Sequence, residues 1–265
     1  MNILHISDLH FGTRHWEGND EKLLEKLNSY SADIVINTGD STTDALESEF
    51  EAARNFLNSI KCEHVISIVG NHDKRNMRSQ DFFQEYINKV DIIHPINPEK
   101  CTKNKLFIDG YTVGIKDKFT DINFIKKISI NGESMLVVCL DTNELYKDNG
   151  NVDEQVLQSV SYEISQQSYD QVILLNHHSV LETDSDPLFN SFRVIDFIKK
   201  HNIQHVFCGH SHKLAIMKTI DLYDQYSFTQ YKIGTLNSHS HPSDTNMFLF
   251  YENLAHLSKN QTKNP

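Results

Sequence analysis

Short apolar runs, almost unbroken by polar residues, constrain the fold of this chain more than any other feature. A strand with one face in water alternates apolar and polar residues, whereas an unbroken run indicates a strand buried on both faces. Runs of this kind predict strands at residues 3–6, 34–36, 65–69, 135–140, 172–175 and 205–208. A sheet built from such strands needs covering layers on both sides.

Polar segments with helical spacing separate several of these runs. Residues 21–30 place Leu23, Leu24 and Leu27 on one stripe, and residues 47–59 and 189–200 show the same spacing. Further strands are predicted, with less regular patterns, at residues 107–115, 228–233 and 247–251. Strands that alternate with helices predict an α/β protein.

The chain carries no internal repeat, low-complexity tract or convincing linker. We therefore expect one domain over residues 1–257, followed by a frayed polar tail over residues 258–265. The apolar share of 38% is ordinary for a folded protein.

The charge balance is acidic, with 36 Asp and Glu against 25 Lys and Arg and a formal net charge of -11. Such a field repels a long polyanion, so no long nucleic acid is expected as a partner. Small anionic substrates remain compatible with it, because bound metal ions invert the field locally.

Compartment and membrane association follow from the cysteines and the apolar runs. The four cysteines form no CxxC pair, which is typical of reduced thiols, and Cys139 and Cys208 lie inside apolar runs that predict burial. No signal peptide is visible, and no apolar run is long enough to span a bilayer. We expect a cytoplasmic protein without a membrane partner.

Metal-binding side chains follow five of the predicted strands. They are Asp8 and His10 after residues 3–6, Asp40 after 34–36, Asn71, His72 and Asp73 after 65–69, His177 and His178 after 172–175, and His210 and His212 after 205–208. The carboxyl ends of neighbouring strands share one edge of an α/β sheet, and ligands gather there. Five loops would therefore deliver these groups to one place.

Imidazole, carboxylate and carboxamide groups suit zinc, iron, manganese and magnesium, and the absence of thiolates argues against a Cys-rich structural zinc site. Seven ligands are too many for one catalytic metal with open positions, and about right for two metals that share a carboxylate. Glycines directly before Asp40, Asn71 and His210 fit a backbone that turns sharply into a site.

Five motifs together resemble the full series of the calcineurin-like metallophosphoesterases. They are Asp8-Leu9-His10, Gly39-Asp40, Gly70-Asn71-His72-Asp73, Asn176-His177-His178 and Gly209-His210-Ser211-His212. Their spacing resembles that of the bacterial class III cyclic-nucleotide phosphodiesterase group within that superfamily.

The resemblance implies a four-layered fold of two mixed β-sheets sandwiched between helices, and two metal ions (Mn, Fe or Zn). It implies a first metal held by Asp8, His10, Asp40 and His212, and a second held by Asp40, Asn71, His177 and His210. His72 would lie beside the leaving group as a catalytic residue, and Asp73 would orient it or tune its charge.

Two departures from the family pattern concern loops near this site. Ser179 follows His178 where the family often has proline, and Asp44 comes one residue later than the usual acidic position, so Asp44 receives no role. His177 aligns with the family's ligand position, whereas His178 is expected to support a ligand or face the substrate.

The predicted function is hydrolysis of a phosphoester at a dinuclear metal centre, most directly in a small diester such as a cyclic nucleotide. The alternatives are a phosphomonoesterase, a DNA-repair-type nuclease and a non-enzymatic metal-binding scaffold for protein assembly. An acidic chain does not favour the nuclease, and a complete ligand set does not favour the scaffold.

Several other polar residues are expected to be structural. His5 is predicted to be a core residue, and surface or strand-edge places are predicted for His94, His201 and His205. His239 and His241 match no motif and are left outside the site, although they could line it. Solvated positions are predicted for Arg14, Lys74 and Arg75, with contact to a substrate phosphate as the alternative.

Overall fold

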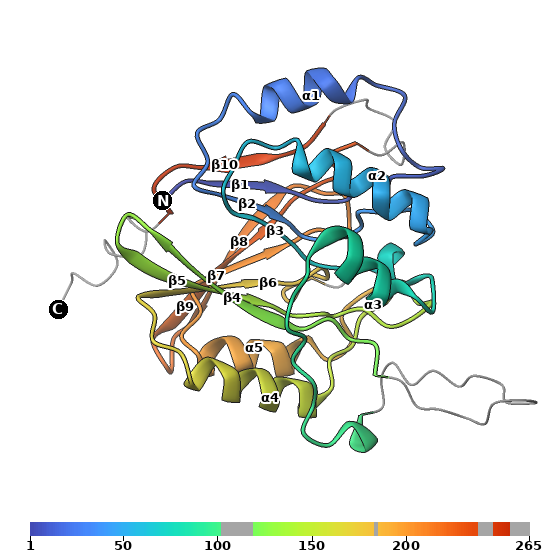
Figure 1. The fold of residues 1–265 in the computed structure, drawn as a ribbon. Helices are drawn as coiled ribbons and strands as arrows, with labels where there is room; N and C mark the ends of the chain where they lie inside the picture. Colours follow the sequence, from blue (N-terminus) through green and yellow to red (C-terminus); the bar gives the residue numbers. More distant parts are fainter. Residues whose placement is uncertain (102–118, 183–184, 238–245, 255–265) are drawn as a thin grey trace, which may run out of the picture.

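The computed structural model describes residues 1–101, 119–182, 185–237 and 246–254. Within these residues, one sheet has four strands in the order β10-β1-β2-β3, and the other has six in the order β4-β5-β6-β7-β9-β8. The sheets lie face to face, with α1 and α2 over one and α4 and α5 over the other (Figure 1). The predicted arrangement of two mixed sheets between helices is confirmed.

The four-stranded sheet contains the first strand of the chain at its centre. Its parallel strands are β1 (Ile3–Ile6), β2 (Ile34–Asn37) and β3 (Val65–Ser67), and β10 (Leu249–Tyr251) pairs antiparallel with β1. The helices that cover it are α1 (Asp20–Leu27) and α2 (Glu47–Asn58).

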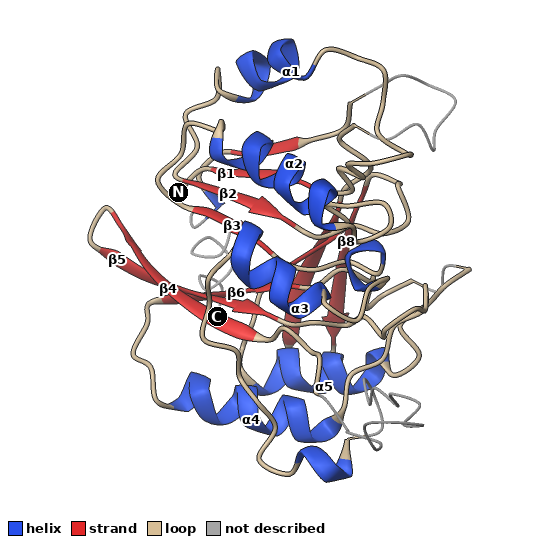
Figure 2. Ribbon diagram, turned by 45° about the vertical axis from the view of Figure 1, so that its right-hand side comes forward, coloured by secondary structure: helices blue, strands red, loops and turns tan. Residues whose placement is uncertain are grey.

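The six-stranded sheet combines a parallel centre with antiparallel edges. Its strands are β4 (Phe124–Ile130), β5 (Glu133–Cys139), β6 (Gln171–Leu175), β7 (His205–Cys208), β8 (Ala215–Asp221) and β9 (Tyr226–Lys232). Strands β5, β6, β7 and β9 run parallel, while β4 and β8 close the two edges antiparallel. Its covering helices are α4 (Glu154–Ser165) and α5 (Ser191–Lys200), which stay below the sheet in both views (Figure 2).

Four short helical segments complete the described elements. They are the 3-10 turns η1 (His72–Lys74) and η3 (Pro98–Lys100), the helix α3 (Ser79–Phe82) and the π-helical turn η2 (Phe83–Ile87). None of the described helices is both long and apolar enough to cross a membrane.

The unbroken apolar runs arise because the sheets are buried on both faces. In β5, Val137 faces the core between the two sheets, and its neighbour Leu136 faces the core beneath α4 and α5. In β2, Ile36 likewise faces the core between the sheets, whereas Val35 packs under α1 and α2. Three apolar layers therefore hold four layers of secondary structure together.

Local sequence explains where α1 begins and which face it buries. Asn19 precedes the helix and its side chain accepts a hydrogen bond from the Lys22 amide at 3.0 Å, which satisfies one free donor of the first turn. Leu23 and Leu27, one turn apart, are buried against the sheet.

Besides the four short helical segments, the structure adds three elements to the predicted set: β4, β8 and α4. Strands β4 and β5 form a hairpin through Asn131 and Gly132, which both have positive φ, at 53° and 83°. An Asn-Gly pair is the typical signal for such a two-residue turn, so β4 could have been predicted from it. The predicted strand at 107–115 and the predicted tail at 258–265 lie outside the described residues, and the extent of a single domain stays a prediction.

Candidate metal centre

All seven candidate ligands lie at the carboxyl ends of parallel strands. Asp8 and His10 follow β1, Asp40 follows β2, Asn71 follows β3, His177 follows β6, and His210 and His212 follow β7. Because the ligands come from both sheets, the site lies where the two sets of strand ends meet.

Four of these side chains surround one point. The Nε2 atoms of His10 and His212 are 3.1 Å apart, and Asp8 Oδ1 is 3.1 Å from His212 Nε2 and 3.8 Å from His10 Nε2. Asp40 Oδ2 is 3.7 Å from His10 Nε2. Asp8, His10 and His212 thus form one group that could hold a metal ion, and Asp40 adjoins this group through His10.

A second group shares Asp40 with the first. His177 Nε2 lies 3.4 Å from Asp40 Oδ2 and 3.0 Å from the amide oxygen of Asn71. His210 Nδ1 is 3.1 Å from the same Asn71 oxygen. The Asp40 Oδ2 atom thus lies between a ring nitrogen of each group, as a shared ligand would.

The partners of the ring nitrogens test whether cations fit the second group. His177 Nδ1 lies 2.8 Å from the carbonyl of Thr38, and His210 Nε2 lies 3.0 Å from the carbonyl of Asp186. A carbonyl only accepts, so these nitrogens carry the protons, and in each neutral ring the other nitrogen turns a lone pair toward the Asn71 oxygen. A metal ion would accept these lone pairs, so the donor set fits a cation, and a ring proton takes that place on His177 when no metal is bound.

The electrostatics of the cluster also favour positive charge. Burial would raise the pKa of Asp8, but His212 and His177 lower it to about 2. Burial would lower the pKa of His177, but Asp40 raises it to about 9. The carboxylates therefore stabilise positive charge inside the cluster, and protonated imidazole rings carry that charge when no metal ion is bound.

Five of the seven candidate ligands have a left-handed backbone. Their φ angles are 56° at Asp8, 47° at His10, 53° at Asp40, 71° at His210 and 52° at His212. This conformation is uncommon for residues other than glycine, and it clusters at functional sites. No sequence motif reveals this backbone conformation directly.

Two glycines allow the ligand loops to approach one another closely. Gly39 has a φ of 103°, and a Cβ atom there would lie 2.6 Å from the Gly70 amide nitrogen. A Cβ atom on Gly70 would lie 2.1 Å from Asp40 Oδ1. The sequence predicts a sharp turn at both positions. At Gly70, glycine is required instead because a side chain would collide with Asp40.

His72 lies at the edge of the first group, within reach of His10 and Asp40. Its Nδ1 atom is 2.6 Å from the carbonyl of Thr43, so Nδ1 carries the proton and Nε2 is left as the reactive nitrogen. The Arg14 guanidinium donates to that Nε2 atom at 3.1 Å.

Asp73 supports the loops around His72 rather than its ring. Its carboxylate accepts hydrogen bonds from the backbone amides of Ser41, Thr42 and Gly70 at 2.8–3.1 Å. The ring of His72 instead donates its hydrogen bond to the Thr43 carbonyl of the same loop. Any influence of Asp73 on His72 therefore passes through the backbone.

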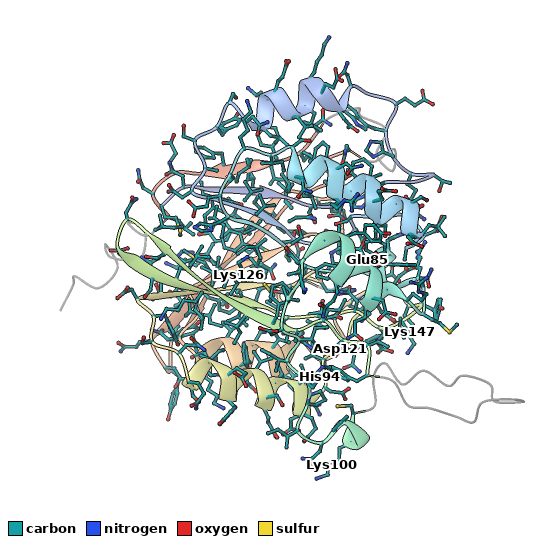
Figure 3. All side chains as sticks on the ribbon, viewed as in Figure 1. Glu85, His94, Lys100, Asp121, Lys126 and Lys147 are labelled. Atoms are coloured by element: carbon teal, nitrogen blue, oxygen red, sulfur yellow. The ribbon has the colours of Figure 1, made fainter. Side chains whose placement is uncertain are left out.

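Lys74 differs from its predicted place, because it is fully buried rather than solvated. Its Nζ atom donates to Asp141 at 2.8 Å and to the carbonyl of Thr120 at 2.6 Å, and lies 4.0 Å from Asp121, labelled in Figure 3. A buried ammonium needs such partners, and here they join the turn after β3 to the loop after β5. Arg75, the next residue, is half-buried and contacts Asp148.

The paired histidines have different surroundings. His178 is fully buried, with Nδ1 2.8 Å from the hydroxyl of Thr142 and Nε2 2.9 Å from the carbonyl of Asp148. Both of its nitrogens are therefore occupied by the protein, as expected for a residue that supports the site. Ser179, at the family's proline position, holds the following turn by accepting from the Glu182 amide at 3.0 Å.

His5, His94, His201 and His205 occupy the structural places expected of them. His5 is fully buried, its Nε2 lies 3.0 Å from the Thr38 hydroxyl, and burial lowers its pKa to about 3. His94 is exposed, and His201 and His205 are partly buried. His239 and His241 lie outside the described residues.

Together, the fold and the site define an α/β protein with a metal-binding cluster where the strands of two sheets end. Residues 1–214 match the family described as calcineurin-like phosphoesterase. The chain belongs to this family of metal-dependent phosphoester hydrolases.

Solved structures with the same fold include nucleotidases. The 5'-nucleotidase precursor of Thermus thermophilus has a TM-score of 0.53 and 12% identity over 89% of this chain and 49% of its own. The NAD nucleotidase of Haemophilus influenzae has a TM-score of 0.51 and 14% identity over 96% and 47%.

The match to these nucleotidases is partial, since the chain spans about half of their length. GAP50, described as the anchor in the inner membrane complex of Plasmodium, is a further match, with a TM-score of 0.50 and 10% identity over 94% of this chain and 77% of its own. No curated protein matches the sequence.

Proposed function

We propose that this chain is a dinuclear-metal phosphodiesterase that acts on a small nucleotide ester such as a cyclic nucleotide. The observation that carries the proposal is the arrangement of ring nitrogens, carboxylates and an amide oxygen around two points that share Asp40 Oδ2. Nitrogen and oxygen donors in this arrangement suit two metal ions.

The two ligand sets divide among the loops as the family resemblance implies. One ion is held by Asp8, His10, Asp40 and His212, and the other by Asp40, Asn71, His177 and His210. When bound, such a metal pair neutralises charge on phosphoryl oxygens and lowers the pKa of water. Manganese, iron and zinc all suit these oxygen and nitrogen donors.

His72 is proposed to protonate or stabilise the departing oxygen. The Thr43 carbonyl holds the Nδ1 proton, so the acid form of His72 carries a second proton on Nε2, and that proton passes to the leaving group. The Arg14 guanidinium, which lies beside that atom, is placed to bind an anionic oxygen of the substrate. Asp73 joins the loop that carries His72 to the loop that carries Thr43 through its hydrogen bonds to both.

The substrate class rests on two kinds of support. The motif spacing resembles a group of cyclic-nucleotide phosphodiesterases, and the net charge of -11 disfavours long nucleic acids. A second candidate is a phosphomonoesterase, because several matching structures are named 5'-nucleotidases. Both candidates take a small nucleotide, and they differ in the ester bond that is cleaved.

A panel of four substrates separates these candidates. We expect Mn²⁺-dependent hydrolysis of bis-p-nitrophenyl phosphate and 3′,5′-cyclic AMP, with slower hydrolysis of p-nitrophenyl phosphate and 5′-AMP, and loss of all activity with a chelator. Monoester cleavage alone would assign the second candidate. Absence of turnover in a protein that holds two metal ions per chain would contradict both and support a binding role.

A further inference from the structure

We propose that Asp148 is a positioning residue that fixes the side chain of Asn71 with its oxygen toward the second metal site. The inference rests on the proposed role of Asn71 as a ligand. Asp148 lies in the loop between β5 and α4, next to Lys147, which is labelled in Figure 3. It belongs to none of the five motifs.

With a metal ion at the second site, the carboxamide of Asn71 has one orientation in which both of its ends would be satisfied. Its oxygen faces His177 Nε2 at 3.0 Å and His210 Nδ1 at 3.1 Å, and its nitrogen donates to Asp148 Oδ1 at 2.9 Å. An ionised carboxylate only accepts hydrogen bonds, so it distinguishes the amide nitrogen from the amide oxygen.

The opposite orientation would remove a ligand. A carboxamide rotated by half a turn would place its oxygen against the Asp148 carboxylate and its NH₂ group toward the cluster. The NH₂ group offers donors but no lone pair to a cation. Asp148 therefore selects the orientation in which Asn71 can bind a metal ion.

Asp148 is itself held from two sides. Arg75 Nη2 donates to the same Asp148 oxygen at 2.9 Å, and Arg75 follows Asn71 on the turn after β3. The backbone carbonyl of Asp148 accepts from His178 Nε2 at 2.9 Å. His178, the neighbour of the ligand His177, thus supports the second site by fixing the loop that orients Asn71.

A purely structural role for Asp148 would give a different result. The Asp148 side chain is 51% exposed and that of Arg75 is 26% exposed, so their ion pair contributes little to folding stability. Loss of a group that orients a metal ligand, in contrast, typically weakens metal affinity about 10–100-fold. Metal affinity and unfolding therefore separate the two roles.

The test is a calorimetric titration of metal-free protein with Mn²⁺, with electron paramagnetic resonance to detect a spin-coupled pair. In Asp148→Ala we expect the first ion to bind as in the unmodified protein and the second to bind about 10–100-fold more weakly, with loss of the coupled signal at limiting Mn²⁺. Asp148→Asn keeps an oxygen that accepts from Asn71 and is expected to recover most of the affinity.

The controls separate a failure of this inference from a failure of the proposed function. Asp221→Ala removes a similar surface ion pair, with Lys199, and is expected to leave both ions unaffected. If Asn71→Ala does not weaken the second ion, the proposed ligand set is wrong. If Asn71→Ala weakens it but Asp148→Ala does not, or if Asp148→Asn is as weak as Asp148→Ala, the orienting role of Asp148 is wrong.

Discussion

Asp40 has the most demanding position of any residue in the candidate site. Its Oδ2 atom lies between His10 and His177, and its Oδ1 atom accepts from the His72 amide at 2.8 Å. One side chain thus touches both ligand groups and the turn that carries the proposed acid. Its positive φ of 53° allows it to reach all three.

Replacing Asp40 with alanine should remove a ligand from both sites at once. We expect fewer than two Mn²⁺ ions per chain after desalting, and a loss of activity greater than the roughly 10–100-fold typical of an outer-shell change. Mass spectrometric metal analysis checks this. Asp44→Ala, on the same loop but half-exposed, is the control and should retain two ions. Two tightly held ions in Asp40→Ala would refute the shared ligand.

His72→Ala should slow turnover about 10²–10⁴-fold while leaving both ions bound, because His72 acts on the leaving oxygen. The loss should be larger for an alkyl diester than for a p-nitrophenyl diester, whose leaving group needs no proton. Rates with both substrates, beside metal content, measure this. The exposed His94 gives the control variant His94→Ala. Equal losses with the two substrates would contradict a role as the acid.

At the residue scale, the sequence predicted the positions of the candidate ligands but not their geometry. Asp8, Asp40 and His210 could be located because each follows an apolar run in the order that the family uses. Their left-handed backbone conformation could not be predicted, since it depends on loops that meet only in the folded chain. The burial of Lys74 was missed for the same reason: its partners Asp141 and Thr120 are distant in sequence.

At the scale of elements, the loops after β2 and β3 pack without space for a side chain between them. A methyl group at Gly70 would lie 2.1 Å from Asp40 Oδ1, closer than any normal contact. The Asp40 carboxylate or the loop must therefore move if a side chain is added.

Gly70→Ala should consequently weaken metal binding as well as stability. We expect weaker binding of both ions in calorimetric titrations, because the displaced residue is shared. Gly132→Ala tests the alternative, since this turn glycine has a φ of 83° but open space around its Cβ position. It should cost about 1 kcal/mol of stability and leave metal affinity unchanged. Equal metal affinity in the two variants would show that the close approach of the loops is not required.

The ion pair between Lys74 and Asp141 connects elements of the two sheets. Removing one partner of a buried pair leaves an uncompensated charge, which typically costs about 3–5 kcal/mol. We expect Lys74→Met to lower the free energy of unfolding by this amount in urea titrations. Lys126→Met, on the outer strand β4, should change it by less than about 0.5 kcal/mol. A small effect of Lys74→Met would mean that water or another group compensates Asp141.

Strands buried on two faces could be predicted from their apolar runs, whereas the runs of the edge strands β4 and β8 are too weak for this. Strands β2, β5 and β6 have apolar residues on both faces, so their runs stand out in the sequence. Strands β4 and β8 lie at edges and alternate with exposed Lys and Ile side chains, such as Lys127 and Ile216, which weakens the apolar signal. Helix α4 was missed although Val156 and Val160 have the helical spacing of a buried face.

At the scale of the whole molecule, the candidate ligands belong to two sheets, which are joined by apolar packing and by polar contacts such as the Lys74–Asp141 ion pair. Asp8, His10, Asp40 and Asn71 extend from the four-stranded sheet, whereas His177, His210 and His212 extend from the six-stranded sheet. Bound ions would therefore cross-link the two halves of the fold.

Metal removal should accordingly lower the melting temperature. An ion at 100 times its dissociation constant stabilises the folded state by about 2.7 kcal/mol, which corresponds to a shift of about 5–10 °C for a chain of this size. Scanning calorimetry with Mn²⁺ and with a chelator measures the shift. His212→Ala, which lacks one ligand, should show a smaller shift, and an unchanged melting temperature in the unmodified protein would contradict the cross-link.

The antiparallel pairing of β10 with β1 has a consequence for the synthesis of the chain. Ile3 pairs with Tyr251, so the outer edge of β1 stays uncovered until a strand almost the whole described length further along the chain has been made. An uncovered edge is a template for pairing with other chains. Since Asp8 and His10 directly follow β1, this uncovered edge lies beside the first two candidate ligands until β10 has been made.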